Sequence, residues 1–294
     1  MKKLRRKERR NMKTKRMIRK LIRVFLCLTA VFAMYSLPVQ AAKQGKINSW
    51  RQVKNLTFSK DVTGDGKSDT VKVKMKRSKG TDGFTVSVNG KQALSKQALY
   101  FNDLTVQYLY MAKNKEFIQI IANGDSSTNV LNEIYRYDKK TKKLVRVLEL
   151  PSEKKSFACY DGRVVSVSGS EIKVQQSYQP PETGWIDWKF TYTYKNGKFK
   201  LKSNTAAVKS SYLAKKNSFR VANSVSFYTS TNLKKKAFTA KRNDVLTLTK
   251  IKVSGGKAYL QFKKNGKTGW QKVGNYSNYF YQNRRWFYGI NLAS

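Results

Sequence analysis

Polar and apolar residues alternate in short runs through most of the chain after residue 52. Val71 to Lys76 and Phe84 to Val88 show the pattern most clearly. A period of two is typical of strands that are buried on one face. Further runs of this kind are Thr105 to Met111, Phe117 to Ala122, Glu133 to Tyr137, Leu144 to Leu150, Val164 to Val167, Ile172 to Gln176, Trp188 to Tyr194 and Lys198 to Lys202. The pattern therefore predicts strands along most of the chain.

The dipeptides between these runs favour tight hairpins. Two-residue hairpin loops require positive φ, which Gly, Asn and Asp supply. Suitable pairs are Asn89-Gly90, Asp161-Gly162, Asn196-Gly197, Gly255-Gly256 and Asn265-Gly266. Helical signals are confined to Gln92 to Ala98 and Ser210 to Lys216, each enough for a turn or two. The expected fold class is all-β and antiparallel.

A small, polar stretch from Asn204 to Ser211 precedes a second set of strands. We therefore expect two domains, residues 42–211 and 212–294, after an N-terminal targeting segment. Of the two tryptophans before this stretch, Trp185 and Trp188, we expect packing in the core of a strand face rather than a platform for sugars.

The first 41 residues are typical of a secretory signal peptide. Residues 1–23 hold 13 Lys/Arg and one acid, and an apolar run from Val24 to Leu37 follows. Small side chains at Val39-Gln40-Ala41 predict cleavage after Ala41. The alternative is an uncleaved membrane anchor, because this run approaches the roughly 20 residues of a bilayer span. Both interpretations place the rest of the chain outside the cytoplasm, secreted or associated with the cell wall.

Composition excludes several kinds of catalytic site. The 294 residues contain no histidine, so Ser-His-Asp and Cys-His sites and His-ligated zinc are impossible. After removal of the signal, Cys159 is the only cysteine and has no partner for a disulfide within the chain. Catalysis would fall to carboxylates, Lys or Tyr, and the alternative to a non-catalytic protein is a carbohydrate-active or wall-modifying enzyme that uses paired acids such as Glu182 and Asp187.

A run of alternating oxygen-bearing residues predicts a calcium site. Asp61, Thr63, Asp65 and Asp69 occupy positions 1, 3, 5 and 9 of one loop, with glycine at position 6 and the carbonyl of Lys67 at position 7. Calcium takes six to eight hard oxygen ligands, which such a loop can supply. The alternative is a turn held by its own side-chain hydrogen bonds.

This loop resembles the calcium loops of FG-GAP and VCBS repeats rather than an EF-hand. Position 12 is Lys72 instead of Glu, and the expected flanks are strands, not helices. The resemblance implies a blade-like, β-propeller-like sheet assembly in which Ca²⁺ rigidifies the loop. A closed propeller of four or more blades does not fit in about 170 residues, so we expect an incomplete or rearranged one.

The last 75 or so residues are similar to bacterial SH3-like domains. The features are an aromatic strand near Phe227, a hairpin after Val245, and the sequence Gly266-Lys-Thr-Gly269-Trp270. The resemblance implies a small β-barrel in which Gly269 allows a turn and Trp270 fills one end. Asn243 stands where such domains commonly have glycine.

Charge indicates the partner of this segment. The chain carries +44, and residues 216–294 hold 16 Lys/Arg and one acid. A basic patch attracts polyanions, and outside the cell these are teichoic acid, peptidoglycan glycan or a membrane surface, with no nucleic acid expected. Candidate ligand-binding residues are Lys234, Lys235, Lys236, Lys241, Arg242, Trp270, Arg284, Arg285 and Trp286.

The aromatic residues of the C-terminal tail leave two interpretations open. They are Tyr276, Tyr279, Phe280, Tyr281, Trp286, Phe287 and Tyr288. They either form a ligand face or cap the barrel. The sequence thus favours an exported, non-catalytic, envelope-associated binding protein stabilised by calcium. A module that binds a host or partner protein is a further possibility.

Overall fold

The computed structural model describes residues 45–78, 81–125, 129–150, 161–211, 215–274 and 285–290. All of them belong to one of the two units into which the chain divides, residues 44–294. The predicted signal peptide and Cys159 lie outside the described residues. No helix in the described ranges is long and apolar enough to cross a membrane.

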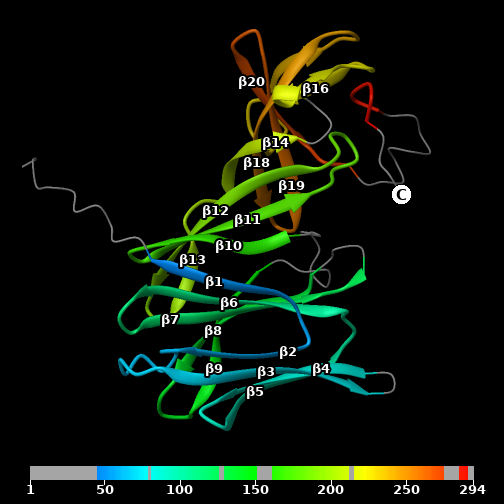
Figure 1. The fold of residues 1–294 in the computed structure, drawn as a ribbon. Coiled ribbons are helices and arrows are strands. Elements are labelled where there is room, and N and C mark those ends of the chain that lie inside the picture. Colours follow the sequence, from blue (N-terminus) through cyan, green and yellow to red (C-terminus); the bar gives the residue numbers. More distant parts are fainter. Residues whose placement is uncertain are drawn as a thin grey trace, which may run out of the picture. The chain divides into compact units, whose positions relative to one another are not determined.

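The structure is all-β, and its strand pairs are antiparallel, as the sequence predicts (Figure 1). One sheet of four strands follows chain order: β2 (Asn55–Lys60), β3 (Asp69–Ser78), β4 (Thr81–Val88) and β5 (Lys91–Leu99). A second sheet has five strands in the order β1 (Lys46–Val53), β6 (Asp103–Ala112), β7 (Lys115–Asn123), β8 (Asn129–Asp138) and β9 (Lys143–Glu149).

The third sheet has eleven strands and reaches the C-terminal region. Its order begins β10 (Asp161–Ser168), β11 (Glu171–Tyr178), β12 (Ile186–Lys195), β14 (Thr205–Ser211) and β18 (Val245–Ser254). It continues with β19 (Lys257–Lys264), β20 (Lys267–Lys272), β16 (Val225–Tyr228) and β17 (Lys236–Ala240). Beside this path, β13 (Lys198–Leu201) pairs with β12 and β15 (Ser218–Arg220) pairs with β18, after a short 3-10 turn at Lys215–Asn217.

The five-stranded sheet is apolar on both faces. Leu104, Val106 and Tyr108 of β6 join a core with the four-stranded sheet. Leu109 and Met111, which point the other way because strand side chains alternate, join a core with β10–β12. Residues before β14 therefore form stacked layers of sheet around two cores, in which this sheet is the central one.

Buried amides fasten the central sheet to β10. Gln107, Gln119 and Asn132 are almost wholly buried and come from β6, β7 and β8. Gln107 donates to the carbonyl of Val164 at 3.2 Å, and the Gln107 and Gln119 side-chain carbonyls accept from its N–H at 3.2 and 3.0 Å. Gln119 and Asn132 both donate to the carbonyl of Gly162, at 2.7 and 2.8 Å.

This contact explains why the prediction of a hairpin at Asp161-Gly162 is wrong. Both residues lie in strand β10. A Cβ on Gly162 would lie 2.5 Å from the amide nitrogen of Asn132, so glycine is needed for close approach rather than for positive φ. The other predicted hairpins are confirmed, and both residues of Asn89-Gly90, Asn196-Gly197, Gly255-Gly256 and Asn265-Gly266 have positive φ.

Two further local predictions are corrected. Gln92 to Ala98, expected as a helical turn, lies in β5, where pairing with β4 overrides the weak helical signal. The polar stretch Asn204 to Ser211 contains strand β14. Ser210 to Lys216 was also expected as a helical turn, and its described residues form only the end of β14 and the start of the 3-10 turn. β14 pairs with both β12 and β18, so the hydrogen-bonded sheet continues across residue 205–211.

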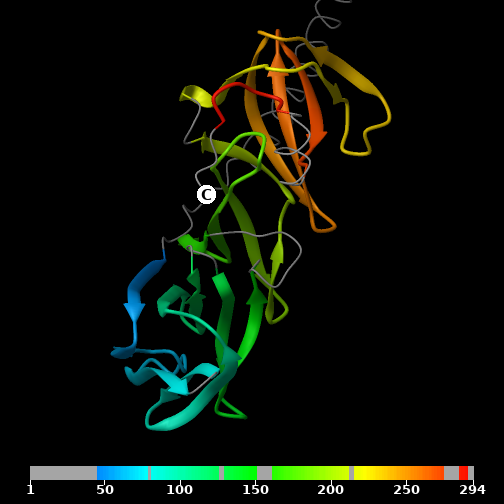
Figure 2. The same ribbon diagram turned by 90° about the vertical axis from the view of Figure 1, so that its right-hand side faces the viewer.

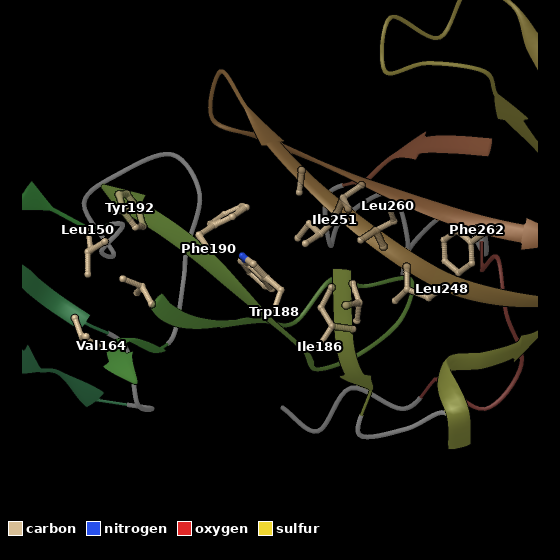
Figure 3. Close-up of a cluster of buried hydrophobic side chains, with 14 of the residues drawn as sticks. Leu150, Val164, Ile186, Trp188, Phe190, Tyr192, Leu248, Ile251, Leu260 and Phe262 are labelled. Carbon is tan, nitrogen blue, oxygen red and sulfur yellow. The ribbon is translucent and has the colours of Figure 1, made fainter. Parts of the chain in front are cut away.

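One core runs through this junction. Trp188 and Phe190 of β12 lie in the same buried cluster as Leu248, Ile251 and Leu260 of β18 and β19 (Figure 3). Trp188 is wholly buried, which confirms its core position. Trp185, directly before β12, is half-buried.

The C-terminal strands enclose an aromatic core. Phe219 and Phe227 both contact Phe262, with ring centroids 6.0 and 5.4 Å apart. Pairings between described residues follow an open path from β14 to β17 (Figure 2). Buried side chains from these strands pack together inside this region. Asn243 has φ of +72°, the left-handed conformation that explains its place where glycine is common.

The roles expected of Gly269 and Trp270 are different from those observed. Gly269 lies inside β20, and a Cβ there would lie 2.6 Å from the Cβ of Phe227 and 3.0 Å from the Phe238 ring. Trp270, the next residue, points to the other face and is half-buried outside the core cluster. Glycine is thus required for packing, and Trp270 does not fill the interior.

We predict that Gly269→Ala destabilises the protein by about 1–3 kcal/mol, because the added methyl group overpacks the contact with Phe227. Urea unfolding of both proteins measures the difference. Thr268→Ala, at the exposed neighbouring position, is the control and should change stability by less than about 0.5 kcal/mol. Equal effects of the two substitutions would contradict the packing argument.

Candidate functional site

The aspartate loop joins β2 to β3 of an antiparallel pair, so its flanks are strands as expected. The carboxylate of Asp61 turns inward. Its Oδ1 accepts hydrogen bonds from the N–H groups of Gly64 at 2.7 Å and Asp65 at 3.2 Å, and its Oδ2 accepts from Gly66 at 2.8 Å. Gly64 and Gly66 both have positive φ, which lets the backbone wrap around this carboxylate.

Asp69 closes the other end of the loop. It is only 3% exposed. Its Oδ2 accepts from the N–H groups of Val62 and Thr63, both at 2.9 Å, and its Oδ1 accepts from the side-chain amide of Asn89 at 2.7 Å. The loop therefore has the internal side-chain hydrogen bonds of a self-supporting turn.

The fit to calcium rests on the oxygens that these bonds leave free. Thr63 Oγ1 is buried and has no hydrogen-bond partner among the described residues, which is unusual for a buried hydroxyl. Asp65 is exposed, and only its Oδ1 is engaged, by the N–H of Lys67 at 2.8 Å. Among the described residues there is no cluster of three or more acids, histidines or cysteines that could hold a metal ion. The Thr63 oxygen and the free Asp65 oxygen are consistent with a cation, and calcium binding stays a prediction.

A pocket of about 430 Å³ lies beside this loop. Four segments that are distant in sequence line it: the aspartate loop, the β6–β7 turn, the β8–β9 hairpin and the β12–β13 hairpin. The lining residues are Val62, Thr63, Asn114, Glu116, Arg136, Tyr137, Asp138, Lys139, Lys140, Val145, Val147, Tyr194 and Gly197. No sequence motif marks this pocket, because each segment contributes only a few ordinary residues.

Arg136 is held in place within the pocket. It donates to the hydroxyl of Tyr194 at 3.2 Å and to the carbonyl of Asn114 at 3.0 Å, and its guanidinium lies 6.0 Å from the centre of the Tyr194 ring. Lys139 donates to the carbonyl of Gly64 at 3.2 Å, which ties the β8–β9 hairpin to the aspartate loop. Neither cation has a carboxylate within salt-bridge distance among the described residues.

Burial and nearby acids raise the pKa of two groups at the base of the aspartate loop, Glu116 and Tyr108. Burial and the nearby charge of Asp61 raise the pKa of Glu116, whose Oε1 accepts from the N–H of Asn114 at 3.0 Å. Burial and the charge of Glu116 also raise the pKa of Tyr108, whose hydroxyl donates to the carbonyl of Asp61 at 3.0 Å.

The predicted basic residues of the C-terminal region lie near two ends of β17. Lys234, Lys235 and Lys236 are exposed where this strand begins, and Lys241 and Arg242 are exposed in the turn after it. Arg242 donates from Nε to the hydroxyl of Tyr288 at 2.6 Å. Asp244, the acid of this region, accepts from the N–H of Lys241 and pairs with Lys264.

The strand register adds residues that the sequence did not indicate. Lys250, Gln261, Trp270, Tyr228 and Lys236 form one row across β18, β19, β20, β16 and β17. Directly paired residues share a face, and Lys252, Tyr259 and Lys272 form a second row on the same face. We call this surface the lysine–aromatic face: Tyr228, Lys236, Lys250, Lys252, Tyr259, Lys263, Trp270 and Lys272.

The remaining predicted residues divide between core and surface. The ring centroid of Trp286 lies 6.2 Å from that of Phe227 and 6.5 Å from that of Phe262. Phe287 is wholly buried, so this part of the tail packs on the core. Arg285 is exposed. Arg284 and the tail aromatics from Tyr276 to Tyr281 lie outside the described residues.

Comparison with known proteins adds no family to these observations. No family model, curated protein or solved structure matches the chain. The resemblances to FG-GAP or VCBS loops and to bacterial SH3-like domains therefore stay predictions.

Glu182, one of the two acids proposed for an enzyme, is a buried connector. It is 2% exposed in the turn between β11 and β12, and its Oε1 accepts from the N–H of Gly274 at 2.6 Å, just after β20. Its Oε2 is buried and has no hydrogen-bond partner within the part of the chain that the structure describes. Burial raises its pKa from the ordinary 4.5 to about 7. Asp187 lies half-buried on β12.

Glu182 predicts a pH dependence of stability. Because its native pKa lies above the unfolded value, the native state keeps a proton that the unfolded chain loses between pH 4.5 and about 7. Stability should therefore fall as pH rises through this window, by at most about 3 kcal/mol from this group. Glu182→Gln should remove that fall, as measured by urea unfolding at pH 4.5 and 7.5.

Glu171→Gln provides a control. The ammonium of Lys202, which donates at 2.8 Å, lowers the pKa of Glu171, so this acid adds stability as pH rises toward its ordinary pKa of 4.5, below the window of Glu182. Glu171→Gln should therefore keep the fall in stability between pH 4.5 and 7.5. If wild type and Glu182→Gln had parallel pH profiles, Glu182 would not be the group responsible.

Proposed function

We propose that this protein is an exported, non-catalytic binding protein of the cell envelope, and that its C-terminal region attaches to anionic cell-wall polymer. The observation that carries the proposal is the lysine–aromatic face. Its lysines Lys236, Lys250, Lys263 and Lys272 are exposed and have no carboxylate partner within salt-bridge distance among the described residues. Half-buried Trp270 and Tyr228 lie between Lys250 and Lys236 in one row, and half-buried Tyr259 lies between Lys252 and Lys272 in the other.

The arrangement suits a polymer better than a single small anion. Residues 216–294 carry 16 Lys/Arg against one acid, and that acid is already engaged by Lys264. Repeated cations on a sheet can meet repeated phosphates or carboxylates along a chain, and each contact adds to the others. Tyr228, Tyr259 and Trp270 offer ring surface to the apolar faces of sugar or polyol units.

Calcium has a structural role in this proposal. Ca²⁺ would use oxygens of Asp61, Thr63, Asp65 and Asp69 and the carbonyl of Lys67, and it would rigidify the β2–β3 connection without taking part in chemistry. The buried, unpartnered Thr63 hydroxyl supports this assignment.

The wall-binding proposal is tested by sedimentation of the mature chain with purified Gram-positive walls, with teichoic acid present or removed. The triple variant Lys250→Gln/Lys263→Gln/Lys272→Gln should bind walls about a hundredfold more weakly. Each lysine near an anionic surface contributes about 1 kcal/mol to the binding free energy, and the variant loses three of them. The matched control is Lys72→Gln/Lys74→Gln/Lys76→Gln, which removes three exposed lysines of β3. Binding that survives teichoic acid removal unchanged, or falls equally in both variants, would contradict the proposal.

Calcium binding is tested by thermal unfolding with and without added Ca²⁺. Calcium should raise the melting temperature of wild type, because a ligand that binds only the native state stabilises it. Asp65→Ala should lose that increase while keeping its stability in chelator, since Asp65 is exposed and engages only the N–H of Lys67. Asp125→Ala, an exposed acid outside the loop, is the control and should respond to calcium as wild type does. An equal calcium response in wild type and Asp65→Ala would leave the loop as a self-supporting turn.

A further inference from the structure

The pocket beside the aspartate loop is separate from the surface proposed to bind wall polymer. Its lining residues come from the central sheet, the aspartate loop and the β12–β13 hairpin, whereas the lysine–aromatic face lies on β16 to β20. The two surfaces share no residue. We propose that this pocket binds a small polyhydroxylated molecule that carries one oxyanion, held by Arg136, Lys139 and Lys140.

The first support is the state of the three cations. Arg136 has five N–H donors, and its described hydrogen bonds go to Tyr194 and Asn114, so donors remain for a ligand. Those two bonds fix the plane of the guanidinium before any ligand arrives, which lowers the entropic cost of binding. Lys139 is likewise positioned by the carbonyl of Gly64.

The second support is the absence of neutralising partners. None of the three cations forms an ion pair with a described carboxylate, although the pocket contains Glu116 and Asp138. Asp138 is instead engaged by the backbone N–H of Lys140 and the hydroxyl of Thr141, at 3.0 and 2.8 Å. Charge-assisted hydrogen bonds from Arg136 and Lys140 are therefore available to an oxyanion.

The third support is the size and mixed character of the pocket. A volume of about 430 Å³ falls in the range of small-molecule sites and exceeds the needs of an inorganic anion. Val147, Tyr137 and Tyr194 provide apolar wall, while Glu116 and Asp138 supply acceptors for hydroxyl groups. A sugar phosphate or a sugar acid fits this lining, because its ring can pack against the apolar residues and its hydroxyl groups can donate to the acceptors.

Isothermal titration of the mature chain at low salt tests the proposal with three probes. Glucose 6-phosphate and glucuronate carry the two kinds of oxyanion, and glucose carries none. At least one of the two anions should bind, and glucose should not. The stronger of the two then identifies phosphate or carboxylate as the preferred group.

The variants separate the pocket from general surface charge. Arg136→Gln and Lys140→Gln should each weaken anion binding about tenfold through loss of a charge-assisted hydrogen bond. Lys142→Gln is the matched control, because Lys142 is exposed in the same hairpin turn and does not line the pocket. The side chain of Lys140 has no described hydrogen bond, so Lys140→Gln tests the site even if Arg136→Gln fails to fold.

Three results would overturn the inference: no binding of either anion at millimolar concentration, equal weakening in Lys142→Gln, or binding of glucose as tight as that of the anions. The lysines altered in the wall-binding test are absent from this pocket. Loss of wall binding in that test would therefore leave the anion titration unaffected, and the two proposals can fail independently.

Discussion

The hydrogen bonds from Gln107, Gln119 and Asn132 to β10 fix the arrangement of the sheets. β10 is the edge strand of its sheet, and its backbone groups at Gly162 and Val164 face buried side chains of the central sheet. A buried backbone group without a partner costs about 1–3 kcal/mol, so these amides satisfy groups that could not otherwise be buried. They also specify the position of β10, because a shift of β10 by one residue would turn the backbone groups of Gly162 and Val164 away from these amides.

Both candidate sites depend on this arrangement. The pocket needs Arg136 from the central sheet and Tyr194 from the sheet that β10 begins, and the two residues hydrogen-bond across that boundary. The lysine–aromatic face lies farther along the eleven-stranded sheet, in which β14 joins β12 to β18. A continuous core from Val164 to Phe262 lies under this path (Figure 3).

Local patterns in the sequence predicted most strands, because alternation and Asn-Gly turns act within a few residues of one another. They failed at Gly162 and Gly269, where glycine is needed because a side chain of another strand comes close. A glycine in a turn and a glycine at a close approach look alike in sequence. The same limit explains why the aspartate loop was found and the pocket was not: the loop is nine consecutive residues, whereas the pocket exists only after four segments meet.

The two proposed sites use positive charge in different ways. Residues 42–294 carry +32, and such an excess destabilises a compact state through self-repulsion. On the lysine–aromatic face the cations are spread over exposed strands, where a flexible polyanion can neutralise many of them at once. In the pocket, Arg136 and Lys139 are held by hydrogen bonds to Tyr194, Asn114 and Gly64, which suits one anion of defined shape. Because a bound anion removes repulsion in either place, each ligand should stabilise the fold, and more strongly at low salt than at high salt.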